Sequence, residues 1–235
     1  MNAGDLLGLP GVGPLPDGHP SVGVLRAAVR DGADAPESVD ALAPALVAVV
    51  PDALARHAAL GIPEAVTVAT LADVGRKIDA YGATVDVPWL VGLLRAEVVA
   101  LGRLQFERDT TPEGRAIHIP EGGSLRPEQV DASIAEARAM FGDGPMICTS
   151  WLLDPTLLSL PETSNIVAFA RRFDVDATEA GHEGDEAAAK FVFRRPLAEV
   201  LDPAAVTPRT TLEHLVADHL RAGRHWSEPK GTLRR

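Results

Sequence analysis

The residues best suited to chemistry lie in one stretch, His118-Ile119-Pro120-Glu121-Gly122-Gly123-Ser124-Leu125-Arg126, which joins a predicted strand to a predicted helix. Two consecutive glycines allow positive φ angles and a close approach of the backbone to a ligand. The first N–H groups of a helix have no partner inside the helix and carry partial positive charge. Gly122, Gly123 and Ser124 therefore predict an anion site for a phosphate or pyrophosphate, and the Arg126 guanidinium would add donors. A tight strand-to-helix connection with Ser124 as a cap is the alternative interpretation.

Two side chains in the same stretch can accept a proton. Glu121 precedes the glycines, and His118 alternates with Ile117 and Ile119. Either group could deprotonate an incoming ammonium, directly or through water. The structural alternatives are a solvated carboxylate near a helix N-terminus for Glu121 and a structural imidazole for His118.

A second set of candidates, Cys148 and Ser150, lies on one face of a predicted apolar strand at 146–153. Ser150 could donate a hydrogen bond to a thiolate or an acyl oxygen, whereas Cys148 is expected to be a buried, inert thiol. Asn165 could contact the pantetheine part of a ligand or cap the preceding turn. His214 and His219 are five residues apart and share no helix face, so we expect no metal site.

The composition limits the class of protein. The charge sum over 235 residues is 22 − 33 = −11, which disfavours nucleic acid and anionic membranes as partners. A single cysteine excludes an intrachain disulfide and suits a reducing compartment. Neither a signal segment nor an apolar run of about 20 residues is present, so we expect a cytoplasmic location.

The elements that must position these residues change in type along the chain. Residues 1–20 are rich in Gly and Pro and predict an irregular arm, and 21–102 predict a helical N-terminal domain. The apolar spacing predicts helices over 40–50, 51–60, 63–81 and 88–101.

Residues 103–235 predict a domain of strands and helices. Alternating residues indicate a hairpin with strands near 103–108 and 115–119, and the helix face Val130, Ile134, Ala137 and Phe141 follows. Strands are predicted at 146–153, 166–173 and 187–195, with an acidic loop at 174–186, and a final helix precedes a basic tail. A strand–helix–strand crossover requires a parallel or mixed sheet. The fold class is therefore α/β (α+β), with helices first and a mixed sheet flanked by helices second.

Several short segments of the sequence resemble a known family: GRLQFER at 102–108, HIPEGGSLRPE at 118–128, CTSWLLDP at 148–155, SNIVAFARRF at 164–173 and HLRAGRHW at 219–226. The chain resembles bacterial GNAT-like acyltransferase-domain proteins, which join a helical N-acyltransferase N-terminal domain to a GNAT-like C-terminal domain. The resemblance implies that Gly122, Gly123 and Ser124 hold the pyrophosphate of coenzyme A. The chain also departs from the family pattern. The loop lacks the spacing of an Arg or Gln followed by x-x-G-x-G/A, and Thr149 stands where most relatives carry His. The only tyrosine, Tyr81, lies in the helical part.

These observations lead to one hypothesis and its alternatives. We expect an acyltransferase that moves an acyl group from acyl-CoA, or from the phosphopantetheine thioester of an acyl carrier protein, to a small amine by direct attack. The thioester is then a co-substrate, and no metal is needed. The alternative is a non-catalytic GNAT-like module that binds an acyl thioester or a partner enzyme of a biosynthetic cluster. A weaker alternative is a hydrolase or decarboxylase acting on the same thioester.

Overall fold

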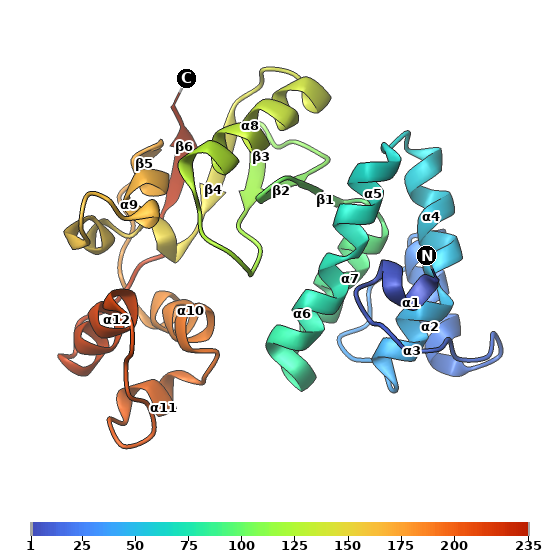
Figure 1. The fold of residues 1–235 in the computed structure, drawn as a ribbon, viewed down its shortest axis with the longest axis horizontal. Helices are drawn as coiled ribbons and strands as arrows, with labels where there is room; N and C mark the ends of the chain where they lie inside the picture. Colours follow the sequence, from blue (N-terminus) through green and yellow to red (C-terminus); the bar gives the residue numbers. More distant parts are fainter. Residues whose placement is uncertain (1, 235) are drawn as a thin grey trace. The chain divides into compact units, whose positions relative to one another are not determined.

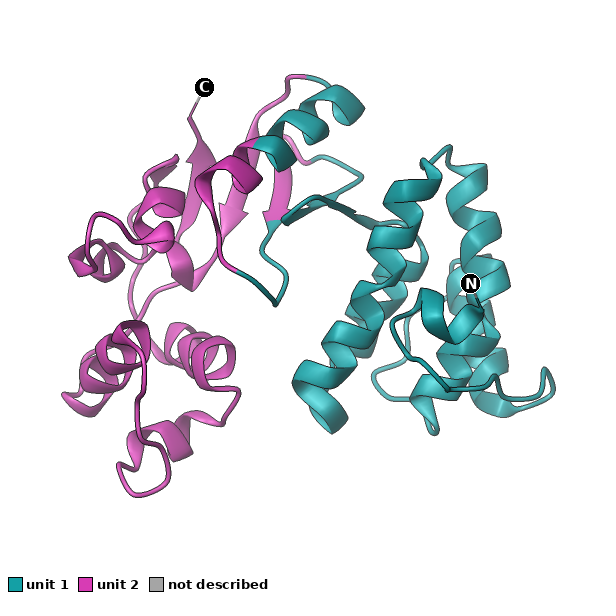
Figure 2. Ribbon diagram, in the orientation of Figure 1, with its two compact units in different colours: residues 1–110, 118–123, 132–142 teal, residues 111–117, 124–131, 143–235 magenta. Residues whose placement is uncertain are grey.

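A computed structural model describes residues 2–234, which form two compact units (Figures 1 and 2). Unit 1 holds the chain up to Thr110 together with His118–Gly123 and Ala132–Gly142. Unit 2 holds Thr111–Ile117, Ser124–Asp131 and the chain from Asp143 onward. The strand β3 (Arg115–His118) and the helix α8 (Pro127–Phe141) therefore each have residues in both units.

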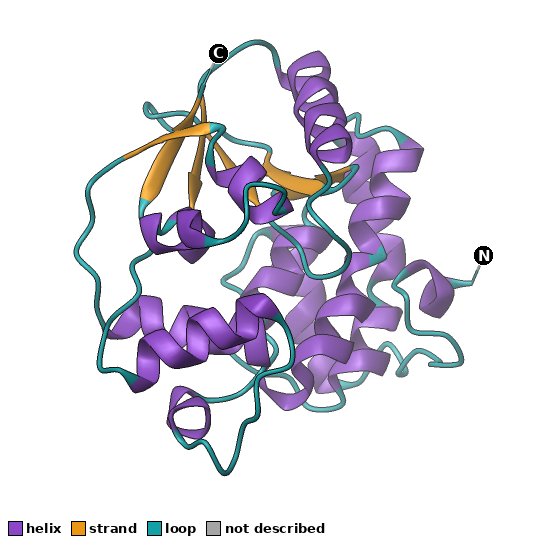
Figure 3. Ribbon diagram, turned by 60° about the vertical axis from the view of Figure 1, so that its left-hand side comes forward, coloured by secondary structure: helices purple, strands orange, loops and turns teal. Residues whose placement is uncertain are grey.

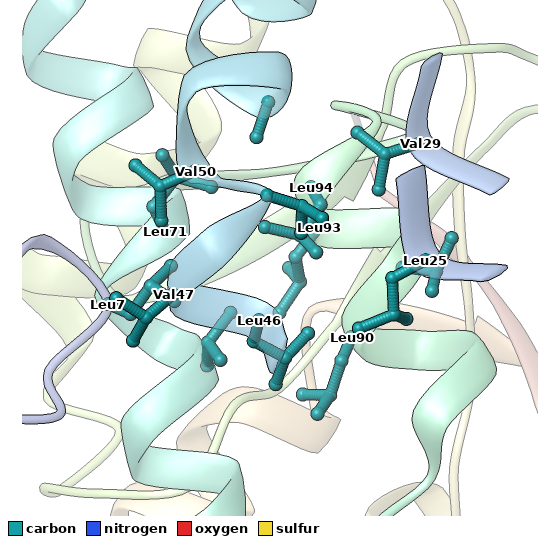
Figure 4. Close-up of a cluster of buried hydrophobic side chains, with 14 of the residues drawn as sticks. Leu7, Leu25, Val29, Leu46, Val47, Val50, Leu71, Leu90, Leu93 and Leu94 are labelled. Carbon is teal, nitrogen blue, oxygen red and sulfur yellow. The ribbon is translucent and has the colours of Figure 1, made fainter. Parts of the chain in front are cut away.

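The N-terminal part of unit 1 is helical, as the apolar spacing predicts. Its elements are α1 (Ala3–Leu6), α2 (Pro20–Asp31), α3 (Leu42–Ala48), α4 (Val50–Ala59), α5 (Glu64–Leu71), α6 (Asp73–Tyr81), the 3-10 turn η1 (Gly82–Thr84) and α7 (Val87–Leu94). Leu25, Leu46, Leu71, Leu90 and Leu94 meet in one buried cluster (Figure 4). Burial of each leucine side chain contributes about 1.5–3 kcal/mol to the stability of the fold, so this cluster holds the helices together.

None of the individual helices within residues 2–234 has both the length and the apolar character needed to cross a bilayer. The pair α3 and α4 reaches that length and composition only together, and the two helices are bent by 50° from each other. Both contribute side chains to the buried cluster of unit 1.

Three expectations for unit 1 need correction. The predicted helix 63–81 is two helices that meet at Ala72, since α6 begins at Asp73. The predicted helix 88–101 ends at Leu94 because Ala96 takes the left-handed conformation (φ 54°). The residues that follow, β1 (Val98–Leu101), pair antiparallel with β2 (Leu104–Glu107). The predicted arm at 1–20 contains the short helix α1 and contributes to the core.

Unit 2 contains a mixed sheet, drawn in orange in Figure 3. The strands β3 (Arg115–His118) and β4 (Met146–Thr149) are parallel, with Arg115 opposite Met146. The strand β6 (Lys230–Leu233) runs antiparallel to both β4 and β5 (Phe173–Val175). The parallel pair is joined through α8 (Pro127–Phe141), as the predicted crossover requires. The predicted fold class, a helical part followed by a mixed sheet with helices, is confirmed.

The remaining elements of unit 2 are helices and turns that follow β4. They are η2 (Trp151–Leu153), η3 (Pro155–Ser159), α9 (Asn165–Ala170), α10 (His182–Phe193), α11 (Leu197–Leu201) and α12 (Thr211–Arg221). Trp151 and Trp226 meet edge to face in their shared core, with ring centroids 6.1 Å apart.

Three predictions for unit 2 are wrong. Residues 166–173 are mostly helix, because the Ser164 hydroxyl accepts a hydrogen bond from the Ile166 N–H and starts α9. Residues 187–195 belong largely to α10, whose first turn carries Glu183 and Asp185, acidic residues that favour a helix N-terminus. The predicted basic tail contains β6.

Gly75 provides a test of the packing in unit 1. Its N–H donates to the Leu7 carbonyl at 2.7 Å, and an added methyl would lie 2.2 Å from the Gly8 carbonyl oxygen. We expect Gly75→Ala to lower the free energy of unfolding by about 1–3 kcal/mol, as overpacking does. Urea denaturation measures this change.

The matched control is Gly23 in α2, which is exposed and has no atom within 4 Å of an added methyl. Gly23→Ala should raise stability by roughly 0.5–1 kcal/mol, because alanine restricts the unfolded chain more than glycine does. Equal stability of the two variants would contradict the close approach of α6 to residues 7 and 8.

Candidate functional site

The parallel pairing of β3 and β4 brings the carboxyl ends of both strands to one edge of the sheet. We call this the carboxyl edge; loop 119–126 leaves β3 there, and Ser150 follows β4 there. Because β6 runs antiparallel to β4, residues just before Lys230 also reach this edge. Ligands of open α/β sheets bind outside the carboxyl ends of the strands, so this edge is the candidate site.

The backbone of loop 119–126 is accessible at its two glycines. Gly122 and Gly123 have φ angles of 103° and 72°, and an added side chain at either would meet no atom within 4 Å. Among residues 2–234, the exposed N–H groups of Gly122, Gly123 and Arg126 donate to no protein acceptor. The sequence predicts that the glycines stand at the start of the helix. The helix α8 begins only at Pro127, so the glycines lie in the loop before its first turn. Unpaired amide groups in a loop of this kind are able to bind an anion.

Arg103, which the sequence did not single out, holds this loop by its carbonyl groups. Its guanidinium donates to the Pro120 oxygen at 3.0 Å and to the Gly123 oxygen at 3.2 Å. Burial lowers the pKa of Arg103, and the negative charge of Glu121 opposes that effect. Arg103 thus fixes the loop through its carbonyl groups, and this contact leaves the N–H groups of the loop available to another partner.

Glu121 is an anchoring contact of the same loop. Its Oε2 lies 2.7 Å from the Lys77 Nζ, and its Oε1 accepts a hydrogen bond from the Tyr81 hydroxyl. Both side chains of the ion pair are nearly buried, at 12% exposure for Glu121 and 13% for Lys77. Burial raises the pKa of Glu121, but the bonds from Lys77 and Tyr81 outweigh it and lower the pKa below 4.5. These contacts favour an ionised carboxylate that fixes the loop to α6.

His118 lies at the end of β3 with both a polar and an aromatic neighbour. Its Nε2 is 3.1 Å from the Glu107 carboxylate, and its ring meets the Trp89 ring edge to face at 4.8 Å. Burial lowers the pKa of His118, although the hydrogen bond to Glu107 opposes the shift. Burial therefore favours the neutral imidazole, in which Nε2–H is the group able to donate to the Glu107 carboxylate.

Three further predicted residues lie in unit 2. The Ser150 hydroxyl accepts from the Leu152 N–H at 3.1 Å and caps η2. Asn165 begins α9 and donates to the Ser124 hydroxyl, so the structure brings these two predicted residues together. Cys148 is buried, and burial raises its pKa to about 12, as expected for an inert thiol.

Several residues that contact loop 119–123 or His118 come from parts of the chain far from the glycines: Lys77, Tyr81, Arg103 and Glu107. No spacing in the sequence connects them to loop 119–126, because only tertiary contacts bring Lys77, Tyr81 and Arg103 to it. Over residues 2–234, no three His, Cys, Asp or Glu side chains form a group suited to a metal ion.

Comparisons with known proteins agree with this architecture. Residues 21–91 match the N-acyltransferase N-terminal domain, and residues 98–233 match the GNAT-like C-terminal domain. No curated protein sequence matches the chain.

Solved structures of acyltransferases are similar over nearly the whole chain. An acyltransferase in complex with decanoyl-CoA and teicoplanin is 30% identical, with 98% of this chain and 85% of that chain covered and a TM-score of 0.78. An acyltransferase in complex with CoA and 10C-teicoplanin is 31% identical, with coverages of 97% and 82% and a TM-score of 0.76. An acyltransferase mutant in complex with octanoyl-CoA is 32% identical, with coverages of 91% and 76% and a TM-score of 0.75.

The resemblance found in the sequence words is therefore confirmed, and the expected co-substrate, a coenzyme A thioester, is bound in the similar structures. The chain belongs to the family of GNAT-like acyltransferases that join an N-acyltransferase N-terminal domain to a GNAT-like C-terminal domain.

Proposed function

We propose that this protein transfers an acyl group from acyl-CoA to an amine by direct attack. The observation that carries the proposal is loop 119–126, which has two glycines at positive φ. The amide groups of its exposed residues Gly122, Gly123 and Arg126 donate to no acceptor among residues 2–234. Similar acyltransferases bind decanoyl-CoA and octanoyl-CoA, which supports acyl-CoA rather than a carrier protein as the donor.

In this proposal the N–H groups of Gly122 and Gly123 bind the pyrophosphate of CoA. Positive φ and the lack of side chains let the phosphate oxygens approach the backbone closely. The Arg126 guanidinium is exposed and has no hydrogen-bond or ion-pair partner among residues 2–234, so it can add a charged donor. Ser124, held by Asn165, continues the same polar surface toward α9.

Direct attack suits the side chains present. An acyl-enzyme would need an activated nucleophile, but Cys148 is buried with a pKa of about 12, and the Ser150 hydroxyl caps η2. Attack by an amine needs the thioester held in place, a proton acceptor and a donor for the acyl oxygen. Two of the similar structures contain teicoplanin or 10C-teicoplanin beside the coenzyme, and for this protein we propose an amine of a small molecule as the acceptor.

The second candidate is a non-catalytic module that binds the acyl thioester. It is favoured by the exposed Thr149 at the end of β4, which offers no titrating group, and by the engaged side chains of Glu121 and His118. Incubation with acyl-CoA and a mixture of amines separates the two. A transferase consumes the thioester only with an acceptor, a binding module retains it, and release of free acid without an acceptor would indicate a hydrolase.

Substitution of Gly123 tests the phosphate site. Gly123→Glu places a carboxylate where the phosphates are proposed to bind, and its φ of 72° strains any side chain. We expect the affinity for CoA to fall at least about tenfold in calorimetry, a loss of about 1.4 kcal/mol.

Gly144→Glu is the matched control, because it adds the same charge at an exposed glycine in the loop after α8, where no atom lies within 4 Å. This control should bind CoA like the unaltered protein. Unchanged CoA affinity in Gly123→Glu would remove the phosphate role of the loop.

Substitution of Glu121 distinguishes anchoring from proton transfer. If Glu121 anchors the loop, Glu121→Gln should lower the free energy of unfolding at pH 7 by about 1.5–3 kcal/mol, because the Lys77 ammonium loses a charged partner. The folded pKa is lowered, so the contribution is present above pH 4.5 and is lost as the pH falls through the folded value. Denaturation at several pH values should show the difference from the unaltered protein closing below pH 4.5.

Glu136→Gln, an exposed carboxylate on α8, is the control and should leave stability within about 0.5 kcal/mol at each pH. A large fall in kcat with unchanged stability in Glu121→Gln would instead identify Glu121 as the proton acceptor.

A further inference from the structure

Glu228 reaches the carboxyl edge from the opposite end of the sequence. The antiparallel register pairs Ile147 with Thr232, Cys148 with Gly231 and Thr149 with Lys230. The pairing continues one step past the strands, since the Ser150 N–H donates to the Pro229 oxygen at 3.2 Å. The next step places Glu228 opposite Trp151, directly beyond the end of β4.

The segment before Glu228 is fixed by two buried carboxylates. Asp185 accepts from the Trp226 N–H at 2.8 Å, and Asp154 accepts from the Ser227 N–H and hydroxyl at 2.8 and 2.6 Å. Gly184 packs so tightly here that an added methyl would lie 2.2 Å from the Trp226 oxygen. The backbone position of Glu228 is therefore set before any ligand binds, as a catalytic group requires.

The Glu228 carboxylate differs from those of Glu121 and Glu113, because it has no cationic partner among residues 2–234. Lys77 binds Glu121 and Lys230 binds Glu113, whereas no ion pair within 4 Å involves Glu228 in residues 2–234. The backbone of Trp151 favours the charged form of this carboxylate. A half-buried carboxylate without a counter-ion is a stronger base than a paired one.

The groups around Glu228 shift the pKa of its carboxyl group in opposite directions. Burial and the nearby Glu183 raise the pKa of Glu228, while the Trp151 backbone and Lys190 lower it, and the net shift is upward from 4.5. Glu183 and Lys190 both come from α10, and Lys230 on its own strand is paired with Glu113. A raised pKa brings a carboxyl closer to the range in which general bases work at neutral pH.

We propose that Glu228 is the catalytic residue that takes the proton from the attacking amine, a role that rests on the proposed acyl transfer. The amine nitrogen donates its lone pair to the thioester carbon, so a C–N bond forms. The C–S bond breaks, and its electron pair leaves on sulfur. The proton released by nitrogen goes to the Glu228 carboxylate and then to the departing thiolate, which gives an amide, free CoA and the original carboxylate.

Glu228→Gln tests this role with the full chain, decanoyl-CoA and an amine that the unaltered protein accepts. We expect kcat to fall about 10²–10⁴-fold, the usual contribution of a general base, while the Kd for decanoyl-CoA stays within twofold. The unaltered enzyme should lose kcat as the pH falls through the pKa of Glu228, and this limb should be absent in the variant. Glu228→Ala should regain activity with added formate, which a purely structural role would not produce.

Glu186→Gln, a 62% exposed carboxylate on α10, is the matched control and should keep kcat, Kd and the pH limb. Circular dichroism checks that each variant is folded. An active unaltered enzyme together with a Glu228→Gln variant within twofold of its kcat would overturn the role of Glu228 alone. An unaltered protein that binds decanoyl-CoA but transfers no acyl group to any amine would overturn the proposed function and this role with it.

Discussion

The parallel pairing of β3 with β4 is the constraint on which the rest of the site depends. Two parallel neighbours cannot be joined by a tight turn, so the chain must leave β3, pass through α8 and return. The ends of both strands then lie at one edge, and the loop before α8 begins there. Because backbone groups of such a loop are outside the sheet ladder, their N–H groups remain available for an anion.

The carboxylates of this protein differ in function because they differ in partners. Glu121 has a lysine and a tyrosine, which keep it ionised and hold loop 119–126 to α6. Asp154 and Asp185 are buried and bind backbone N–H groups, which fixes residues 226 and 227. Burial and the nearby Glu183 raise the pKa of Glu228, whereas the bonds from Lys77 and Tyr81 lower that of Glu121. Residue type alone does not separate these cases.

Contacts with neighbouring elements also explain why some predicted helices and strands differ from the structure. Val98 and Leu101 fit the four-residue spacing of the preceding helix, yet they form a strand because Ala96 ends the helix and β2 offers a partner. Residues 187–193 read as an apolar strand, but they pack as the end of α10 against α11 and α12. Short apolar runs satisfy both periods, so only the neighbouring element decides between them. The sequence did not single out Glu228, because only the pairing of β6 with β4 brings it to the end of β4.

The sequence by itself determined the order of a helical part and a mixed sheet, the glycine pair before α8 and the family. These features are local: they depend on apolar periodicity, on the conformational freedom of glycine and on contiguous words of sequence. The tertiary structure decided which groups surround each titrating side chain. Lys77 meets Glu121 across 44 positions of the chain (121 − 77), and Glu228 meets the end of β4 across a strand pairing. Long-range contacts of this kind set burial and charge, and these in turn set the pKa of each group.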